Sequence, residues 1–269
     1  MTQEDALPPD VERIRAGNAG PLSLTGTNTY LVGSPAFVVD PGPAEPAHVE
    51  RVWEAAQARG GVAGIVLTHR HIDHAESAPA LRARSGAPLA AGRESGVRAF
   101  YEEPGADAIE PDVTLGEGDR FGPFHVLETP GHAADHVSLL AGTVLFCGDT
   151  VLGEGSVFVA PGGNSLASYL RSLEKLEALD LSALCPGHGP VVWQPREKLR
   201  DYLEHRRDRE RRLVAALEHG LRSRDELLDE VWDDAPPALR PAAGLTLEAH
   251  LEKLASEGRL PDGVERLSL

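Results

Sequence analysis

The heptapeptide Thr68-His69-Arg70-His71-Ile72-Asp73-His74 places three histidines and one aspartate within seven residues. It follows the apolar run Gly64-Ile65-Val66-Leu67, which has the composition of a buried strand. Neutral imidazole and carboxylate groups are ligands that zinc and similar divalent cations bind. The first two histidines are spaced to reach one ion, and the aspartate and third histidine can reach a second. The heptapeptide therefore predicts a metal site on the loop that leaves a strand.

Three further segments end an apolar run with a histidine or an aspartate beside a glycine. Glycine lets the backbone and a bound ion approach closely. A solvated surface cluster, the alternative explanation of the heptapeptide, does not account for these segments. The expected set places His69, His71 and His132 on one ion, Asp73, His74 and His188 on the other, and Asp149 between the two. Five histidines and two carboxylates without cysteine are typical of a dinuclear hydrolytic site.

The ligand set resembles that of the metallo-β-lactamase superfamily over most of residues 20–190. Val38-Val39-Asp40-Pro41-Gly42 resembles the first motif of the superfamily, in which a strand ends in a buried structural aspartate. Residues 25–33 and 129–136 are similar to the lactamase-beta-like protein 2 branch, which contains endoribonucleases. The resemblance implies a four-layer αββα sandwich of the α/β (α+β) class, followed by a small winged-helix domain.

A bridging aspartate at position 149 resembles glyoxalase II, phosphodiesterases and RNA nucleases of the superfamily. Zinc β-lactamases normally lack this aspartate, so antibiotic hydrolysis is disfavoured. A water that bridges two cations has its pKa lowered toward neutrality and becomes a hydroxide nucleophile. The resemblance implies that Asp73 orients this water in addition to binding a metal. Two zinc ions are expected, with iron or manganese as alternatives, because the ligands contain no soft sulfur.

Three more polar residues are candidates for substrate contact. Asn28 and Tyr30 lie on the loop that the branch places near the cleft. His136 follows His132 by four residues and could face the substrate or support a ligand. A hydrogen-bonded structural histidine is an equally good interpretation of His136.

Composition favours a water-soluble enzyme. The chain has 269 residues, 41% of them hydrophobic, and lacks an apolar run of about 18 residues, so no membrane span is expected. The acidic N-terminus lacks the apolar segment of a secretory signal, and the two cysteines do not make a disulfide framework, so a cytoplasmic location is expected. Cys147 and Cys185 lie in apolar runs and are expected to be buried. The sequence leaves a homodimer open.

The chain is expected to divide into a catalytic domain, residues 1–194, and a winged-helix-like domain, residues 195–269. In the first, the periodicity predicts strands at 30–40 and 62–68, several short strands within 112–148, and helices at 45–59, 75–84 and 165–179. In the second, it predicts helices at 195–218, 223–231 and 245–257, followed by a hairpin tip at 260–264.

The charge pattern bears on nucleic-acid binding. The net charge is −16, and helix 245–257 carries three glutamates against one lysine, so duplex DNA is a disfavoured partner. Within helix 195–218, residues 206–212 contain a cluster of five arginines, Arg206, Arg207, Arg209, Arg211 and Arg212. The helical spacing places Arg206, Arg209 and Arg212 near one stripe. This stripe could guide the backbone of a single strand. The alternative is a solvated helix face whose arginines pair with neighbouring acidic residues.

Two enzymatic functions therefore remain open, both with an anionic substrate. The branch resemblance implies a phosphodiesterase, most simply an endoribonuclease acting on single-stranded RNA. The alternative is a thioester hydrolase, similar to glyoxalase II or to acyl-thioesterases. A β-lactamase is less well supported, and a noncatalytic binding module conflicts with the intact ligand set.

Overall fold

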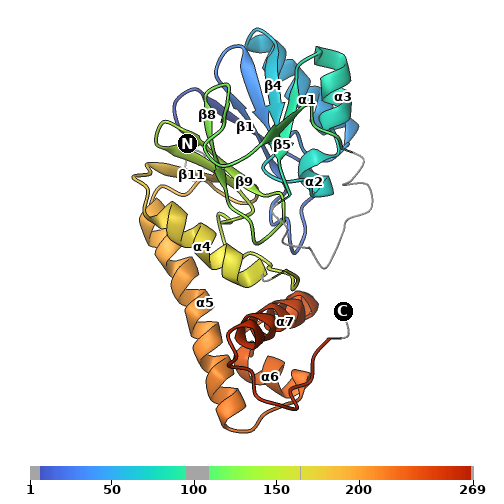
Figure 1. Ribbon diagram of the computed structural model, residues 1–269. Helices are drawn as coiled ribbons and strands as arrows, with labels where there is room; N and C mark the ends of the chain where they lie inside the picture. Colours follow the sequence, from blue (N-terminus) through green and yellow to red (C-terminus); the bar gives the residue numbers. More distant parts are fainter. Residues whose placement is uncertain (1–6, 95–108, 164, 268–269) are drawn as a thin grey trace.

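Two β-sheets lie face to face in the upper part of the molecule, with helices on their outer faces (Figure 1). The computed structural model describes residues 7–94, 109–163 and 165–267. The first sheet has the strand order β1-β2-β3-β4-β5-β6, with β1 (Val11–Arg15), β2 (Asn28–Val32), β3 (Ala36–Val39), β4 (Val62–Val66), β5 (Leu89–Gly92) and β6 (Val113–Leu115). The second sheet has the order β11-β10-β9-β8-β7, with β7 (Arg120–Phe121), β8 (Phe124–Glu128), β9 (Val137–Ala141), β10 (Val144–Gly148) and β11 (Ala183–Pro186).

Eight helices are described. Those of the sandwich are α1 (Pro46–Ala58), α2 (Ile72–Ala75), α3 (Ala78–Ser85) and α4 (Ser165–Glu177). Those that follow the last strand are α5 (Pro195–Glu218), α6 (Arg224–Val231), the 3₁₀ helix η3 (Pro237–Leu239) and α7 (Arg240–Ser256).

The layers follow from the alternation of side chains along each strand. In β2, Tyr30 packs between the two sheets, whereas Leu31 faces the helices α1 to α3. In β10, Phe146 packs between the sheets, whereas Leu145 and Cys147 face α4 and the first half of α5. Each sheet therefore buries both of its faces, which gives the expected four-layer αββα sandwich. Both cysteines are buried and free, as the apolar runs around them predicted.

Three element boundaries differ from the expectation. The strand expected at 30–40 is two antiparallel strands, β2 and β3, because the chain turns at Gly33, whose φ is 80°. The helix expected at 75–84 is split into α2 and α3, since Pro79 fits only the first turn of a new helix. The helix expected at 245–257 begins earlier, at Arg240, with Pro241 in its first turn.

The C-terminal helices form a smaller core below the sandwich (Figure 1). Leucines from the second half of α5, from α6 and from α7 make this core: Leu213, Leu217, Leu227, Leu247, Leu251 and Leu254. At the hairpin tip expected at 260–264, the described residues form a turn at 262–263 without flanking strands. The segment turns at Gly263, with φ 77°, and Glu265 N–H donates to the Arg222 carbonyl at 2.9 Å.

The division of the chain after residue 194 stays a prediction. Helix α5 begins at the expected boundary, at Pro195. Leu199 and Leu203, in its first half, pack in the same core as α4 and β10 of the sandwich. The first half of α5 is thus part of the hydrophobic core of the catalytic half.

The expectation that the arginine stripe of α5 guides a nucleic acid is wrong, because two of its three members point inward. Arg206 and Arg209 are only 3% and 6% exposed. Arg209 makes an ion pair with Asp234 at 2.6 Å, and Arg212 makes one with Asp233 at 2.7 Å. The two remaining arginines of the cluster are exposed but bind neighbouring carboxylates: Arg207 pairs with Glu174, and Arg211 with Glu204 and Asp208.

No helix in the described part of the chain combines the length and the apolar character needed to cross a membrane. The cytoplasmic location stays a prediction, and the acidic residues 1–5 that contributed to it lie outside the described residues.

One buried carboxylate holds the loop that follows β4. Asp40 Oδ1 accepts the backbone N–H of Thr68 at 2.7 Å, and its Oδ2 accepts the Thr68 hydroxyl at 2.7 Å. His74 Nδ1 lies 3.0 Å from the same Oδ2. Asp40 therefore ties both ends of the ligand-rich heptapeptide to the end of β3, as expected for a structural aspartate.

Replacing Asp40 by alanine should lower the free energy of unfolding by about 3 kcal/mol, because three buried donors lose their acceptor. Urea denaturation with a chelator present would measure this loss without a contribution from bound ions. Asp119→Ala is the control, since that half-exposed carboxylate accepts one backbone N–H, from Gly116, and lies 3.9 Å from the exposed Arg93. Equal effects of the two substitutions would contradict the anchoring role of Asp40.

Candidate metal centre

The predicted ligands come from four loops that each leave the carboxyl end of a strand. The heptapeptide follows β4 and continues into the short helix α2. His132 follows β8, Asp149 follows β10, and His188 follows β11. The structure gathers donor atoms of all seven residues into three overlapping groups: His69, His71 and His132; His69, His74 and Asp149; and Asp73, His74 and His188. Two of these groups are the two triads expected from the sequence.

The first triad brings three imidazoles together. His71 Nδ1 lies 3.0 Å from His69 Nε2 and 3.0 Å from His132 Nε2. Burial, helped by the proximity of His132, lowers the pKa of His71 to about 3. A neutral imidazole is the form that binds a metal ion, so His71 has the protonation state of a ligand.

The second triad contains a carboxylate and two imidazoles. His188 Nε2 lies 3.4 Å from Asp73 Oδ2 and 3.3 Å from His74 Nε2. His74 Nε2 is 3.6 Å from Asp73 Oδ2. A carboxylate with two histidines is a ligand combination that suits divalent cations.

Asp149 lies between the triads. Its Oδ2 is 3.7 Å from His132 Nε2 and 3.3 Å from His188 Nε2, so one oxygen reaches toward both groups. Burial raises the pKa of Asp149, but His188 and His74 outweigh this effect and hold the pKa well below its ordinary value. Its Oδ1 is buried and accepts no hydrogen bond within the described residues. Buried carboxylate oxygens are normally satisfied, so this atom fits a position next to a cation.

The second ring nitrogen of most histidine ligands has its own acceptor. His132 Nδ1 lies 2.9 Å from the Phe158 carbonyl, and His188 Nδ1 lies 3.4 Å from the Gly26 carbonyl. His74 Nδ1 faces Asp40, as described above. A proton held at Nδ1 leaves the lone pair of Nε2 for a metal ion. The donor set therefore fits two divalent cations.

Two threonines also contact the ligands, although the sequence did not single them out. The Thr27 hydroxyl donates to Asp73 Oδ2 at 2.7 Å, and the Thr68 hydroxyl lies 3.0 Å from His69 Nδ1. Thr68 is adjacent to a ligand in sequence, which was the available signal. Thr27 lies within the 25–33 motif, but the motif does not specify which of its side chains faces the site.

The sequence profile of the metallo-β-lactamase superfamily matches residues 22–188. The chain belongs to the metallo-β-lactamase superfamily. The profile of the beta-lactamase associated winged helix domain matches residues 223–262, which agrees with the helices α6 and α7.

Named relatives cover almost the whole chain. A beta-lactamase-like protein 2 homolog from Caenorhabditis elegans is 34% identical over 92% of this chain and 85% of its own length. An atrochrysone carboxyl ACP thioesterase from Aspergillus fumigatus is 32% identical over 81% of this chain and 68% of its own length. The solved structure of TTHA1623 in a di-iron-bound form is 28% identical, with a TM-score of 0.54 over 69% of this chain and 96% of that chain.

Two residues expected to contact substrate in this metallo-β-lactamase fold are buried and bind backbone carbonyls instead. The Asn28 amide donates to the carbonyls of Pro186 and Gly189 at 3.0 and 2.9 Å. The Tyr30 hydroxyl donates to the Pro186 carbonyl at 2.9 Å. Both side chains hold the loop that carries His188. The geometry thus supports a positioning role for them, in place of the substrate contact expected from the sequence.

His136 is also buried and lies behind the ligands. Its ring stacks on the His69 ring, with centroids 5.1 Å apart and an interplanar angle of 27°. Its Nε2 accepts the backbone N–H of Asp149 at 3.1 Å, and its Nδ1 lies 2.8 Å from the Thr129 hydroxyl. Burial holds the pKa of His136 well below its ordinary value, so the ring is neutral and able to accept that bond. His136 supports the position of two ligands and does not face a substrate.

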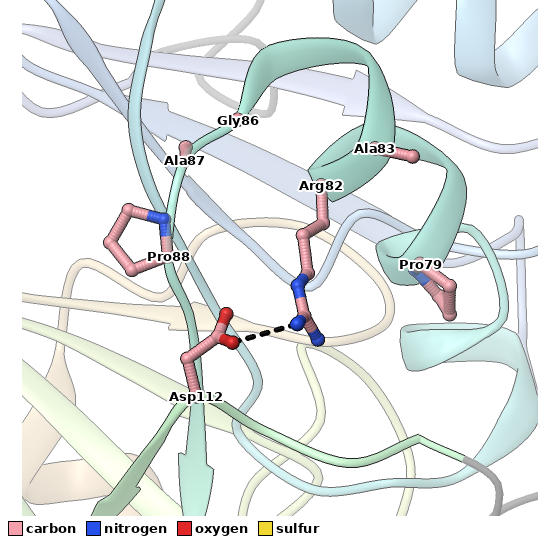
Figure 2. A pocket seen from close by; sticks show the side chains of 7 residues that line it. All are labelled: Pro79, Arg82, Ala83, Gly86, Ala87, Pro88 and Asp112. Carbon is pink, nitrogen blue, oxygen red and sulfur yellow. Dashed lines mark ion pairs between the residues drawn. The ribbon is translucent and has the colours of Figure 1, made fainter.

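A surface pocket beside α3 is separate from the ligand cluster. Its wall includes the ion pair between Arg82 and Asp112, at 2.7 Å, which Figure 2 shows across the pocket. The other lining residues are small or apolar: Pro79, Ala83, Gly86, Ala87 and Pro88. None of these seven residues belongs to the ligand set, so this pocket is not part of the candidate metal centre.

The purified chain should contain two divalent ions per subunit, and Asp149→Ala should weaken the binding of one or both. Since loss of a residue that only supports a ligand typically costs 10–100-fold in metal affinity, loss of the shared ligand should cost more than about 100-fold. Elemental analysis after dialysis would measure the ion content. The exposed Asp180→Ala is the matched control. One ion in the wild-type chain, unchanged in Asp149→Ala, would contradict a bridging aspartate.

Proposed function

We propose that this metallo-β-lactamase superfamily hydrolase uses two divalent cations to cleave an acyl thioester. The observation that supports a dinuclear enzyme is the convergence of the two triads on Asp149. When bound, two cations would lower the pKa of a water and stabilise negative charge on a substrate oxygen. Zinc is the expected metal, with iron or manganese as alternatives. The di-iron form of the structural relative agrees with iron as an occupant of such a site.

Asp73 is the ligand that we assign to the reaction itself. Its side chain is 33% exposed, whereas the side chains of His74 and His188 are almost fully buried. Burial alone would raise the pKa of Asp73. The nearby His74 has the opposite and larger effect, so the pKa of Asp73 lies below its ordinary value. Asp73 is therefore ionised at neutral pH. Thr27 fixes its Oδ2, which leaves Oδ1 to orient the attacking water and accept its proton.

The charges on α5 favour a thioester over RNA. All five arginines of the cluster bind groups of the protein, and two of them are buried. An RNA-binding groove needs cations that are free to replace counterions on phosphates, and the net charge of −16 opposes such binding. The thioesterase among the relatives is 32% identical over most of this chain. RNA phosphodiester hydrolysis remains the second candidate, because the same two triads would serve it.

The wild-type enzyme should hydrolyse acyl thioesters with kcat/KM at least about 100-fold higher than that for single-stranded RNA or bis-p-nitrophenyl phosphate. S-acyl glutathione, acyl-coenzyme A and nitrocefin complete the panel, and thiol release reports the thioester reaction. Faster cleavage of RNA than of any thioester would reverse the preference. An enzyme that holds two ions but cleaves none of these compounds would support a noncatalytic binding module instead.

His71→Ala and Asp73→Ala should each reduce kcat for every substrate by roughly 1,000-fold, because both residues act on the shared nucleophile. The exposed His219→Ala, which changes a histidine far from the cluster in sequence, should retain wild-type turnover. Initial rates at saturating substrate would measure these effects. A turnover in Asp73→Ala within a few-fold of wild type would remove Asp73 from the reaction.

A further inference from the structure

The segment of residues 150–163 links the bridging ligand to α4 and lies between the catalytic half and the C-terminal helices. Val157 and Val159 are buried in the core that also contains Leu199 and Leu203 of α5. Glu252 of α7 accepts the backbone N–H of Gly162 at 2.8 Å. The position of this segment therefore depends on helices beyond the sandwich.

The same segment supports a metal ligand through its backbone. The Phe158 carbonyl lies 2.9 Å from His132 Nδ1, and His132 Nε2 lies 3.0 Å from His71 Nδ1. The carbonyl accepts the Nδ1 proton, which fixes the tautomer of His132 and the rotation of its ring. A shift of the 150–163 segment would therefore turn Nε2 away from the other two imidazoles of the first triad.

Helix α5 holds this segment from one face. Lys198, Tyr202 and Arg206 follow one another at intervals of four residues and lie on the same side of the helix. Lys198 Nζ donates to the Gly153 carbonyl at 3.1 Å, and the Tyr202 hydroxyl donates to the Gly155 carbonyl at 2.9 Å.

Arg206 makes the contact nearest to the ligand. Its Nη2 donates to the Val157 carbonyl and to the Ser156 hydroxyl, the latter at 3.0 Å. Its guanidinium lies 5.5 Å from the centre of the Tyr169 ring, and the Tyr169 hydroxyl donates to the Thr150 carbonyl at 2.7 Å. Among the described residues, no carboxylate forms an ion pair with Arg206, although its side chain is almost completely buried. A buried charge without an ionic partner costs free energy, so the contacts of Arg206 with residues 156 and 157 are not explained by stabilisation alone.

We propose that Arg206 is a positioning residue for the metal ligand His132 and acts through the backbone of residues 156–158. The inference rests on the proposed dinuclear site. Without the guanidinium, the Val157 carbonyl loses its donor, and the adjacent Phe158 carbonyl is free to move. The first triad should then bind its ion less tightly. The second triad should be less affected, since Asp73 and His74 are held by Thr27 and Asp40.

Arg206→Met tests the inference, with Arg209→Met as the matched control. Arg209 lies on the same helix and is equally buried, but it binds the Val231 carbonyl and Asp234 and not the 150–163 segment. Competition titration of the ion-free chains with Zn²⁺ and a chromophoric chelator measures each binding step. Arg206→Met should weaken one step by about 10-fold, the low end of what the loss of a ligand-supporting contact costs. Arg209→Met should bind both ions within about 2-fold of wild type, even where its melting temperature falls equally.

Arg206→Lys keeps the charge but not the planar set of donors, and it provides a variant that should fold. It should weaken the same step by about 3-fold, with a smaller loss of thermal stability. Equal zinc affinities in wild type, Arg206→Met and Arg206→Lys would overturn the positioning role, as would an equal loss in Arg209→Met. A wild-type chain that binds fewer than two zinc ions would instead contradict the proposed dinuclear function.

Discussion

Seven ionisable side chains meet in a small, largely buried volume. Much of the surrounding structure holds these side chains in place through hydrogen bonds. Neutral imidazoles and ionised carboxylates at such separations are stable when cations lie between them and when every remaining polar atom has a partner. Asp40 contacts the His74 ring and His136 accepts the backbone N–H of Asp149, whereas Asn28 and Tyr30 bind carbonyls of the loop that carries His188. The residues around the site are therefore as specific in their hydrogen bonds as the ligands themselves.

Much of the site could be predicted from the sequence, because its information is local. A ligand that follows an apolar strand beside a glycine can be recognised without knowledge of the rest of the chain. Gly187 illustrates the physical reason, since a Cβ at this position would lie 2.4 Å from Asp149 Oδ1. The αββα layers came from the family resemblance, as periodicity alone predicts only a mixed α/β domain.

Other features could not be predicted, because they depend on which way a face points. The spacing of arginines on α5 correctly places Arg206 and Arg209 on one stripe, but spacing does not say whether that stripe faces solvent or core. The polar groups of Asn28 and Tyr30 favour an exposed position in the sequence. In the structure they are buried because they bind carbonyls of the loop that follows β11. Backbone acceptors such as the Phe158 carbonyl leave no trace in the sequence, because any residue could supply them. Pro79 is visible in the sequence and indicates the start of a new helix, but the helical periodicity of residues 75–84 favours one continuous helix.

Helix α5 contributes leucines to two cores, with Leu199 and Leu203 in the sandwich and Leu213 and Leu217 among the C-terminal helices. Because this helix packs in both cores, local unfolding at either of its ends would expose leucines of the core at that end. The two family matches end at residue 188 and begin at residue 223, so α5 lies between them and packs in both cores. Evolution could exchange the terminal helices α6 and α7 more freely than α5, whose first half must continue to match the catalytic fold that it covers.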